Sequence, residues 1–479
     1  MQSPLPQGHW SADHRRQLGR IRFRRAVTLM LMTLVLPGSA QIVAGRKETG
    51  RIAMRIWFGL VVSLVALLLI GLVNHTFVIW FFTDTRVLTL LRFVLMGLAV
   101  GWAYLFVDAW RIGEPLALAQ KQRLAMVGIN GVLCFAVAGT LLFASHIVTV
   151  QKDWITTMFG TGKAQHATDG RYNVLLLGGD SGADRWGLRP DSITVASIDA
   201  SSGKTILFGL PRNMLNFPFA KGSIMDQQFP DGYDCGSQCE LNSLATWSLD
   251  HKALFKGYKN PGVEATAEAV EGITGLKIHY FAMVNLKGFQ KMVDAVGGVT
   301  LKVRDRIPIG GIGAPVTGYI QPGTRKLDGF DTLWFARSRE SADDYSRMAR
   351  QKCVMNAMLH QLSPATVVRK FGAIAKASTQ LITTNIPRSE ITNFTSLALK
   401  ARNQPVRTVS FVPPMIVTAH PDIAKIKQLV HNAIHPPKKT KSGGGSKHAA
   451  SNEGTTGGAI GNIHSGYAAN QASDLGAAC

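Results

Sequence analysis

Long apolar segments dominate the first 150 residues of the chain. They run over residues 26–45, 56–73, 87–110 and 125–150. A stretch of about 18 or more apolar residues is a candidate membrane-spanning helix. The segments follow one another without a small-residue cleavage site, so we expect a retained anchor of three or four helices over 26–150 rather than a cleaved signal peptide.

The hydrophobic pattern becomes shorter and more regular after residue 170. Residues 173–177, 193–198 and 205–210 predict three successive strands, with the turn DASSGK between the last two. Helices and strands then alternate, which predicts an α/β domain over 170–435 with a central mixed sheet flanked by helices. The further predicted elements are helices at 263–274, 287–296, 365–377 and 391–399, and strands at 278–284, 299–303 and 408–412. The last two helices are either ordinary core or the lining of an apolar tunnel, and core is the simpler reading.

The composition changes on either side of this domain. Residues 1–25 form a basic terminus, and residues 151–169 read as a linker. Residues 436–479 are rich in Gly, Ser, Ala and Asn and have no hydrophobic periodicity, which predicts a disordered tail.

Basic residues indicate the orientation of the anchor. Residues 1–25 carry six arginines, and the loop after the first apolar segment is also basic, so both should stay in the cytoplasm. Three spans would then place the large domain outside. The break at Pro37-Gly38 lets the first segment return to the same face, which we favour. The alternative is four full spans with the N-terminus outside.

The net charge of +22 raises the question of a nucleic-acid partner. Much of the excess positive charge lies in the N-terminus, in loops beside the membrane and in a tail that begins at Lys438. Membrane topology and attraction to anionic lipid or wall polymer account for basic residues at these places. We recognise no helix-turn-helix or zinc-finger motif in the sequence, so we expect no nucleic-acid partner.

Two carboxylates and an arginine stand at the ends of the first three predicted strands. In an up-down-up meander, Asp180, Asp191 and Arg212 would meet at one edge of the sheet. Paired carboxylates suit Mg²⁺, and a guanidinium fork fits a phosphate. The alternative is a salt-bridged loop.

A second cluster is rich in arginine. Its residues are Arg337, Arg339, Arg347, Arg350 and Gln351, beside Asp344. The first two would point to the same side of an extended segment, and the next three fall at i, i+3 and i+4 on one helix face. Like charges so close favour an anion between them, and the helix starting near Asp344 adds its positive end. A solvated basic helix would look similar. The apolar positions of this helix, Met348, Met355, Met358, Leu359 and Leu362, should face elsewhere, into the core.

These segments resemble the LytR-CpsA-Psr family over roughly residues 170–415. The resemblance lies in NVLLLGGDS, RPDSITVASID, LPRN, GFQKMVDAVGGVTLKV, LDGFDTLWFARSR and DYSRMARQ, in that order. Members are bacterial envelope enzymes that move glycopolymers from a polyprenyl diphosphate carrier onto peptidoglycan. The resemblance implies a phosphotransferase on the outer side of the cell membrane, with the lipid in an apolar pocket. Its partners would be the lipid-linked glycan, the peptidoglycan acceptor and membrane lipid.

The resemblance also implies roles for particular residues. Asp180 and Asp191 would hold Mg²⁺ (or Mn²⁺). Asp191, Arg212, Arg337 and Arg339 would be catalytic, and Arg189, Arg212, Arg337, Arg339, Arg347 and Gln351 would bind the diphosphate. Asp344 and Asn213 would support the same site. A carboxylate such as Asp191, or the substrate itself, would have to act as the base.

Two positions depart from the family pattern. Gly182 stands where an arginine is common, with Arg185 or Arg189 as substitutes, and Asn213 replaces a common aspartate. An amide cannot act as a base or bring charge to a cation, so we expect weaker metal binding. Two other functions therefore stay open. One is a lipid pyrophosphatase, and the other is a non-catalytic membrane protein that binds lipid diphosphate or has a regulatory role.

The five cysteines divide by context. Cys235 and Cys239, four apart in a polar loop, predict a disulfide in an oxidising exterior, since a metal pair would need two more ligands. Cys134 is expected to be a packing residue within an apolar segment, and Cys353 a buried residue of the arginine-rich helix. Cys479 has no partner that the sequence identifies.

Overall fold

The computed structural model describes residues 12–180, 189–311, 315–340, 343–361, 374, 382–436 and 468–479. The chain forms two compact units, Met1–Ile155 and Thr156–Cys479. The predictions for Gly182 and Arg185, for nearly all of the helix at 365–377 and for the tail at 437–467 lie outside the described residues.

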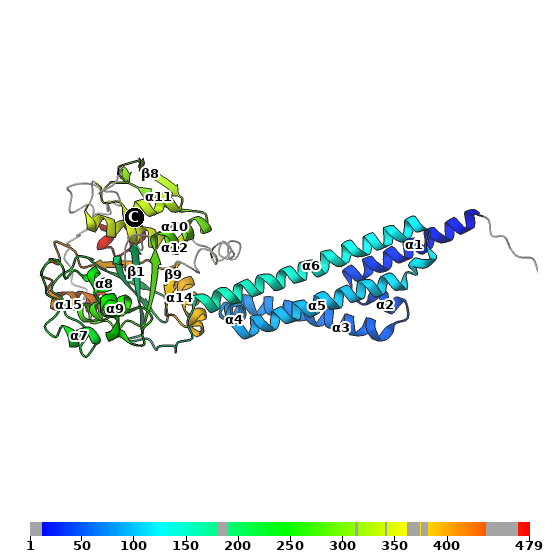
Figure 1. Cartoon of the computed structure of the whole chain (residues 1–479), viewed down its shortest axis with the longest axis horizontal. Coiled ribbons are helices and arrows are strands. Elements are labelled where there is room, and N and C mark those ends of the chain that lie inside the picture. Colours follow the sequence, from blue (N-terminus) through cyan, green and yellow to red (C-terminus); the bar gives the residue numbers. More distant parts are fainter. Residues whose placement is uncertain are drawn as a thin grey trace, which may run out of the picture. The chain divides into compact units, whose positions relative to one another are not determined.

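The first unit is helical (Figure 1). Its helices are α1 (Ala12–Val35), α2 (Ser39–Val43), α3 (Lys47–Val73), α4 (His75–Thr83), α5 (Thr85–Ile112) and α6 (Gln120–Met158). Three of the described helical segments are long and apolar enough to cross a membrane: Lys47–Val73, Thr85–Ala117 and Gln120–Met158.

The first apolar segment is broken where the sequence predicts. Helix α1 ends at Val35, and Gly38 has a φ of +95°, a conformation that favours glycine. The short α2 that follows is fixed to α5, because Gln41 donates to the Leu105 carbonyl at 3.0 Å. At the start of α3, Arg46 forms an ion pair with the buried Asp108 of α5. Whether this segment re-enters the membrane stays a prediction.

The second unit is built on a six-stranded mixed sheet, which confirms the predicted fold class. The strand order is β10-β3-β2-β1-β4-β9. The first three strands pair antiparallel as the predicted meander, whereas β4 runs parallel to β1 and β10 parallel to β3. The strands are β1 (Arg171–Asp180), β2 (Arg189–Asp199), β3 (Thr205–Leu210), β4 (Tyr280–Asn285), β9 (Ile382–Thr384) and β10 (Arg407–Ser410).

Alternating residues of the strands supply the cores on the two faces of this sheet. In β2, Ile193 and Val195 pack with α9 (Pro261–Thr274) and α15 (Ile423–Ile434), in a core that also includes α7 (Ile224–Gln228) and α8 (Leu244–Asp250). Ala196 of the same strand packs with α12 (Asp344–Gln361) instead.

A third apolar cluster joins the end of α12 to α10 (Leu286–Val296) and α11 (Gly329–Arg337). Two small sheets belong to it. They are β5 (Val299–Val303) with β8 (Gly323–Leu327), and β6 (Ile307–Ile309) with β7 (Gly318–Ile320). The helix predicted at 391–399 forms as α14 (Ile391–Ala401).

The prediction of a disordered tail is wrong for residues 468–479. This C-terminal segment contains α16 (Leu475–Ala478) and packs against α12 and β10. Cys479, which had no partner in the sequence analysis, forms a disulfide with Cys353 of α12. The alanines and Leu475 of this segment show too little hydrophobic periodicity for the sequence to predict that it packs against the domain. The structure also pairs Cys235 with Cys239, as the sequence predicts.

A fully buried lysine lies under this C-terminal segment. Lys352 Nζ donates to Asn470 Oδ1 at 2.8 Å, and the Ser410 hydroxyl donates to the same oxygen at 3.1 Å. Burial lowers the pKa of Lys352 to about 7.

Stability should therefore depend on pH through Lys352. The folded pKa lies below the unfolded value, so the unfolded chain binds the extra proton between pH 7 and 10. Stability should rise with pH in that window, by at most about 1.4 kcal/mol per pH unit. Thermal unfolding at pH 7 and at pH 9 measures this increase in stability. Wild type and Lys326→Met, a control at an exposed lysine, should be more stable at pH 9, whereas Lys352→Met should not. An equal gain in Lys352→Met would contradict the assignment.

Candidate functional site

A bulge in β2 sets the position of Asp191. Gly178 pairs with Ser192 and Gly179 pairs with Pro190, so Asp191 is an extra residue between two paired positions. Bulges re-aim a side chain in this way. The Asp191 carboxylate accepts a hydrogen bond from Arg212 Nη1 at 2.5 Å, so these two predicted residues meet at the strand ends.

The strand pairing places Asp180, the third residue predicted for this edge, and Arg189, a predicted diphosphate-binding residue. β1 ends at Asp180, whose backbone lies opposite Arg189 at the start of β2. The Arg189 side chain is exposed. The edge of the sheet thus brings together the chain positions that the meander predicted.

Asp344, the first residue of α12, links the two sequence stretches. Its Oδ2 accepts from Arg347 at 3.0 Å, and its Oδ1 lies 3.5 Å from Arg212 Nε and 3.9 Å from Arg339 Nη1. Arg347 also donates to the Asp191 carbonyl at 2.9 Å. Three guanidinium groups therefore form ion pairs with Asp344, and Arg212 forms a second one with Asp191.

Burial makes the charge of Arg347 costly. The Arg347 side chain is only 4% exposed, and burial lowers its pKa although Asp344 and Asp191 oppose the change. Burial alone would also lower the pKa of Arg212, but the charges of Asp344 and Asp191 outweigh it and raise that pKa. Within the described residues, Arg347 Nε has no hydrogen-bond partner. An anion at this point would satisfy it.

An apolar pocket of about 270 Å³ opens beside these groups. Its polar lining includes Asp191, Arg337, Arg347 and Gln351, four of the predicted site residues. Gln351 is held by donating to the Ala336 carbonyl at 3.2 Å, and the Arg337 guanidinium lies 5.5 Å from the Trp334 ring. The apolar lining includes Leu176, Leu177, Val284, Phe289, Met292, Leu333, Val354, Met355 and Met358.

The structure corrects two expectations about the arginine cluster and extends a third. Met355 and Met358 pack against the apolar clusters, as the sequence predicts, and they also line the pocket. Arg337 is the last residue of α11, so it does not lie in an extended segment with Arg339. Arg350 does not share the pocket-facing side of α12 with Arg347.

Arg350 instead has a positioning role that the sequence analysis missed. It is fully buried, and its Nη2 donates to the Ser338 carbonyl between Arg337 and Arg339. Burial, with the neighbouring charge of Arg347, lowers its pKa to about 10. The sequence shows that Arg337 and Arg339 stand close to Arg347 and Arg350. This spacing does not indicate which of the four arginines is buried.

The oxygen donors for a cation are few in the described part of the chain. No group of three or more His, Cys, Asp or Glu residues suited to a metal occurs among those residues. The Asn213 side-chain oxygen is buried without a hydrogen-bond partner there, and Asp191 is partly exposed. This donor set fits a cation that takes most of its remaining oxygens from a phosphate ligand and water.

The fold and site define a class of protein: an α/β domain, in a chain with membrane-length helices, that presents guanidinium groups at the mouth of an apolar pocket. The LytR_cpsA_psr family model matches residues 148–428, and the chain belongs to this family.

Several relatives are similar over part of their length. Biofilm regulatory protein A of Streptococcus mutans is 25% identical, with 59% of this chain and 65% of the relative covered. Polyisoprenyl-teichoic acid–peptidoglycan teichoic acid transferase TagU of Oceanobacillus iheyensis is 26% identical, with 48% and 64% covered. The chain thus spans less than two thirds of these curated relatives. The crystal structure of Bacillus subtilis TagV is 22% identical, covers 56% of this chain and 98% of TagV, and has a TM-score of 0.40.

Proposed function

We propose that this protein is a membrane-anchored phosphotransferase that moves a glycopolymer from a polyprenyl diphosphate carrier to peptidoglycan during cell-wall assembly. One observation carries the proposal: guanidinium groups, including the buried Arg347 whose Nε has no hydrogen-bond partner in the described structure, stand at the mouth of an apolar pocket. A lipid diphosphate has the matching chemistry, an anion joined to a hydrocarbon chain. Family membership and the name of the TagU relative support the same reaction class.

In this proposal the prenyl chain enters the pocket between α10 and α12. The diphosphate then lies against Arg337 and Arg347 at the rim, with Arg212 and Arg339 completing the positive field. Gln351, fixed by the Ala336 carbonyl, can donate its second amide hydrogen to a phosphate oxygen. Arg189 at the exposed strand edge faces the glycan side of the donor.

The reaction transfers the phosphoryl group next to the glycan. A hydroxyl oxygen of peptidoglycan forms a bond to that phosphorus, and the bond from phosphorus to the bridging oxygen breaks. Polyprenyl phosphate leaves, and the hydroxyl proton passes to the Asp191 carboxylate, which Arg212 holds in place. Such a step depends on alignment of the nucleophile and on neutralising charge, which the arginines supply.

The residues that would hold Mg²⁺ (or Mn²⁺) are Asp180 and Asp191, with the unpaired oxygen of Asn213 as a neutral donor. When bound, the cation would neutralise phosphate charge beside the arginines. Asp344 is committed to three guanidinium groups and serves to position them.

We place the second unit outside the cytoplasm of a bacterial cell, anchored by several spans. Three membrane-length helices and a cytoplasmic basic N-terminus fit an external domain. Both disulfides lie in the second unit, which suits an oxidising exterior.

A product assay tests the proposed reaction. The full chain, in detergent, is incubated with a lipid-linked glycan, Mg²⁺ and peptidoglycan fragments, and the products are identified by mass spectrometry. Glycan phosphate joined to the fragment is the expected product. Free glycan phosphate would show a pyrophosphatase, and bound but unchanged donor would show a binding protein; either result would overturn the transfer reaction.

Asn213 gives a prediction about the metal. Asn213→Asp adds a carboxylate at a buried oxygen that has no partner in the described structure, so it should lower the Mg²⁺ concentration needed for half-maximal activity by about tenfold. Asn403→Asp makes the same charge change at an exposed position and should have no effect. An unchanged Mg²⁺ requirement in Asn213→Asp would remove residue 213 from the metal site.

A further inference from the structure

The C-terminal segment, residues 468–479, packs on the side of α12 that faces away from the pocket of the second unit. Arg347 and Gln351 of α12 line the pocket. Ala349 and Cys353 of the same helix pack against the C-terminal segment. The spacing of these two sets places them on opposite sides of an α-helix. The C-terminal segment therefore supports α12 from behind, while the predicted site residues lie in front.

Asn470 is the polar contact between the C-terminal segment and α12. Its side chain is fully buried. Asn470 Nδ2 donates to the Tyr345 carbonyl at 2.9 Å, and Tyr345 lies between Asp344 and Arg347 in the first turn of the helix. Asn470 Oδ1 accepts from Lys352 Nζ at 2.8 Å, one turn further along. One side chain thus links the C-terminal segment to the part of α12 that carries the predicted site residues.

The non-covalent contacts of the C-terminal segment are modest. Its buried apolar residues are three alanines and one leucine, Ala469, Ala472, Leu475 and Ala478. Alanine buries little apolar surface, so their packing contributes little. The 31 residues of 437–467 separate the segment from the preceding described chain, so the backbone connection confines it only weakly. Chain ends are also among the first parts of a protein to open. The Cys353–Cys479 bond therefore decides whether the segment stays docked.

This disulfide can exchange with an external dithiol. Cys353 is only 1% exposed, whereas Cys479 is partly exposed at the chain end. A thiolate of the dithiol forms a bond to Cys479 Sγ, and Cys353 leaves as a thiolate that takes up a proton. The second thiolate of the dithiol then displaces Cys479, which also takes up a proton. The dithiol is oxidised to a disulfide, and the protein gains two electrons. A disulfide oxidant reverses these steps.

We propose that the Cys353–Cys479 disulfide is a redox latch for the diphosphate site. In the oxidised chain the C-terminal segment is docked and holds the start of α12 in place. In the reduced chain the segment detaches, Asn470 releases Tyr345 and Lys352, and the affinity for the lipid diphosphate falls. The exchange partner is a dithiol–disulfide oxidoreductase. The effect on the donor rests on the proposed function, whereas the movement of the C-terminal segment does not.

The test uses the full chain in detergent with Cys353 and Cys479 as its only cysteines, in the variant Cys134→Ala/Cys235→Ser/Cys239→Ser. Hydrogen–deuterium exchange and affinity for geranylgeranyl diphosphate are measured in the oxidised chain, after reduction with dithiothreitol, and after reoxidation. Reduction should raise deuterium uptake in residues 468–479 and at the start of α12. It should weaken binding about tenfold, as expected if roughly one molecule in ten stays docked. Reoxidation should restore both.

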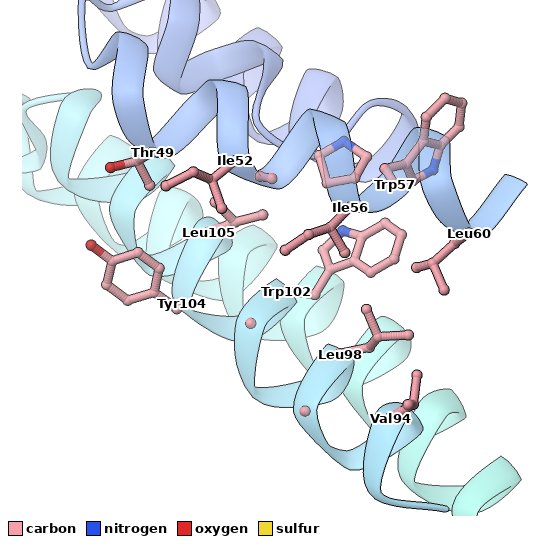
Figure 2. A pocket seen from close by; sticks show the side chains of 14 residues that line it. Thr49, Ile52, Ile56, Trp57, Leu60, Val94, Leu98, Trp102, Tyr104 and Leu105 are labelled. Carbon is pink, nitrogen blue, oxygen red and sulfur yellow. The ribbon is translucent and has the colours of Figure 1, made fainter. Parts of the chain in front are cut away.

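The first unit supplies the internal reference for deuterium uptake. Its helices α3 and α5 contain no cysteine and face each other across an apolar groove lined by residues such as Ile56 and Leu98 (Figure 2). Uptake in these helices should be the same in the oxidised and reduced chains. Adding Cys479→Ser to the test variant should give the uptake of the reduced chain, whether or not oxidant is present.

Each outcome of this experiment bears on one part of the proposal. Unchanged uptake in a chain whose mass shows two free thiols would overturn the latch, as would losses that reoxidation does not reverse. Reversible uptake with unchanged affinity would overturn the coupling to the donor. If the oxidised chain does not bind geranylgeranyl diphosphate, the proposed function fails, and reversible uptake at the start of α12 would still support the latch.

The route through Asn470 has its own variant. Asn470→Asp keeps an acceptor for Lys352 but loses the donor to the Tyr345 carbonyl. The oxidised variant should therefore bind geranylgeranyl diphosphate several-fold more weakly than the oxidised parent. Asn403→Asp makes the same change at an exposed position and should bind like the parent. Parent-like affinity in Asn470→Asp would remove Asn470 as a positioning residue.

Discussion

Replacing Arg337 with alanine is expected to lower glycan transfer by about a thousandfold while the fold stays intact, because arginines that neutralise a transferring phosphoryl group contribute on this scale. Arg337 is exposed at the pocket rim beside the Trp334 ring, so its removal should leave the buried core unchanged. Arg337→Lys keeps the charge but loses the planar fork, so it should recover only part of the activity. The measurement is the initial rate of glycan joined to peptidoglycan fragments.

Arg325→Ala is the matched control for this prediction. Arg325 is an exposed arginine on β8 whose guanidinium donates to the Pro322 carbonyl, and it does not line the pocket. Its loss should leave the rate within twofold of wild type. Wild-type rates in Arg337→Ala and Arg339→Ala would remove both residues from the diphosphate site.

Loss of the Cys353–Cys479 disulfide should be the largest stability effect of any cysteine substitution in the chain. This bond joins residues 126 positions apart, and loop-closure entropy predicts a contribution of about 5 kcal/mol. Cys479→Ser should lower the free energy of unfolding of the second unit by several kcal/mol. The C-terminal segment would then be held by packing and by hydrogen bonds such as the one that Lys352 donates to Asn470. Chemical denaturation with a tryptophan fluorescence readout measures the change.

The second disulfide provides the comparison. Cys235 and Cys239 are four positions apart, so the same relation predicts only about 2 kcal/mol for Cys239→Ser. A smaller effect for Cys479→Ser than for Cys239→Ser would contradict the role given to the C-terminal segment.

Local patterns predicted much of the α/β unit because its elements are strongly periodic. The third strand was predicted at its observed bounds, since every residue of β3 is buried and is bounded by turn residues. The helix starting near Asp344 was predicted because a charged start precedes a long helical pattern. The C-terminal segment could not be predicted, because its packing depends on contacts with residues such as Thr408 that are distant in sequence.

The site was predictable in its composition but only partly in its geometry. Asp191 and Arg212 meet because antiparallel strands place alternate ends at one edge, a consequence of the meander. The direction of each arginine on α12 depends on tertiary contacts instead. Arg350 points inward to the Ser338 carbonyl just after α11, whereas Met355 faces the pocket that α10 also lines.

The most direct test of diphosphate binding by these arginines is a structure of the full chain bound to geranylgeranyl diphosphate. We expect the prenyl chain in the pocket lined by Phe289 and Met355, and the diphosphate within hydrogen-bond distance of Arg337 and Arg347. A prenyl chain bound elsewhere, or a diphosphate that touches neither arginine, would contradict it.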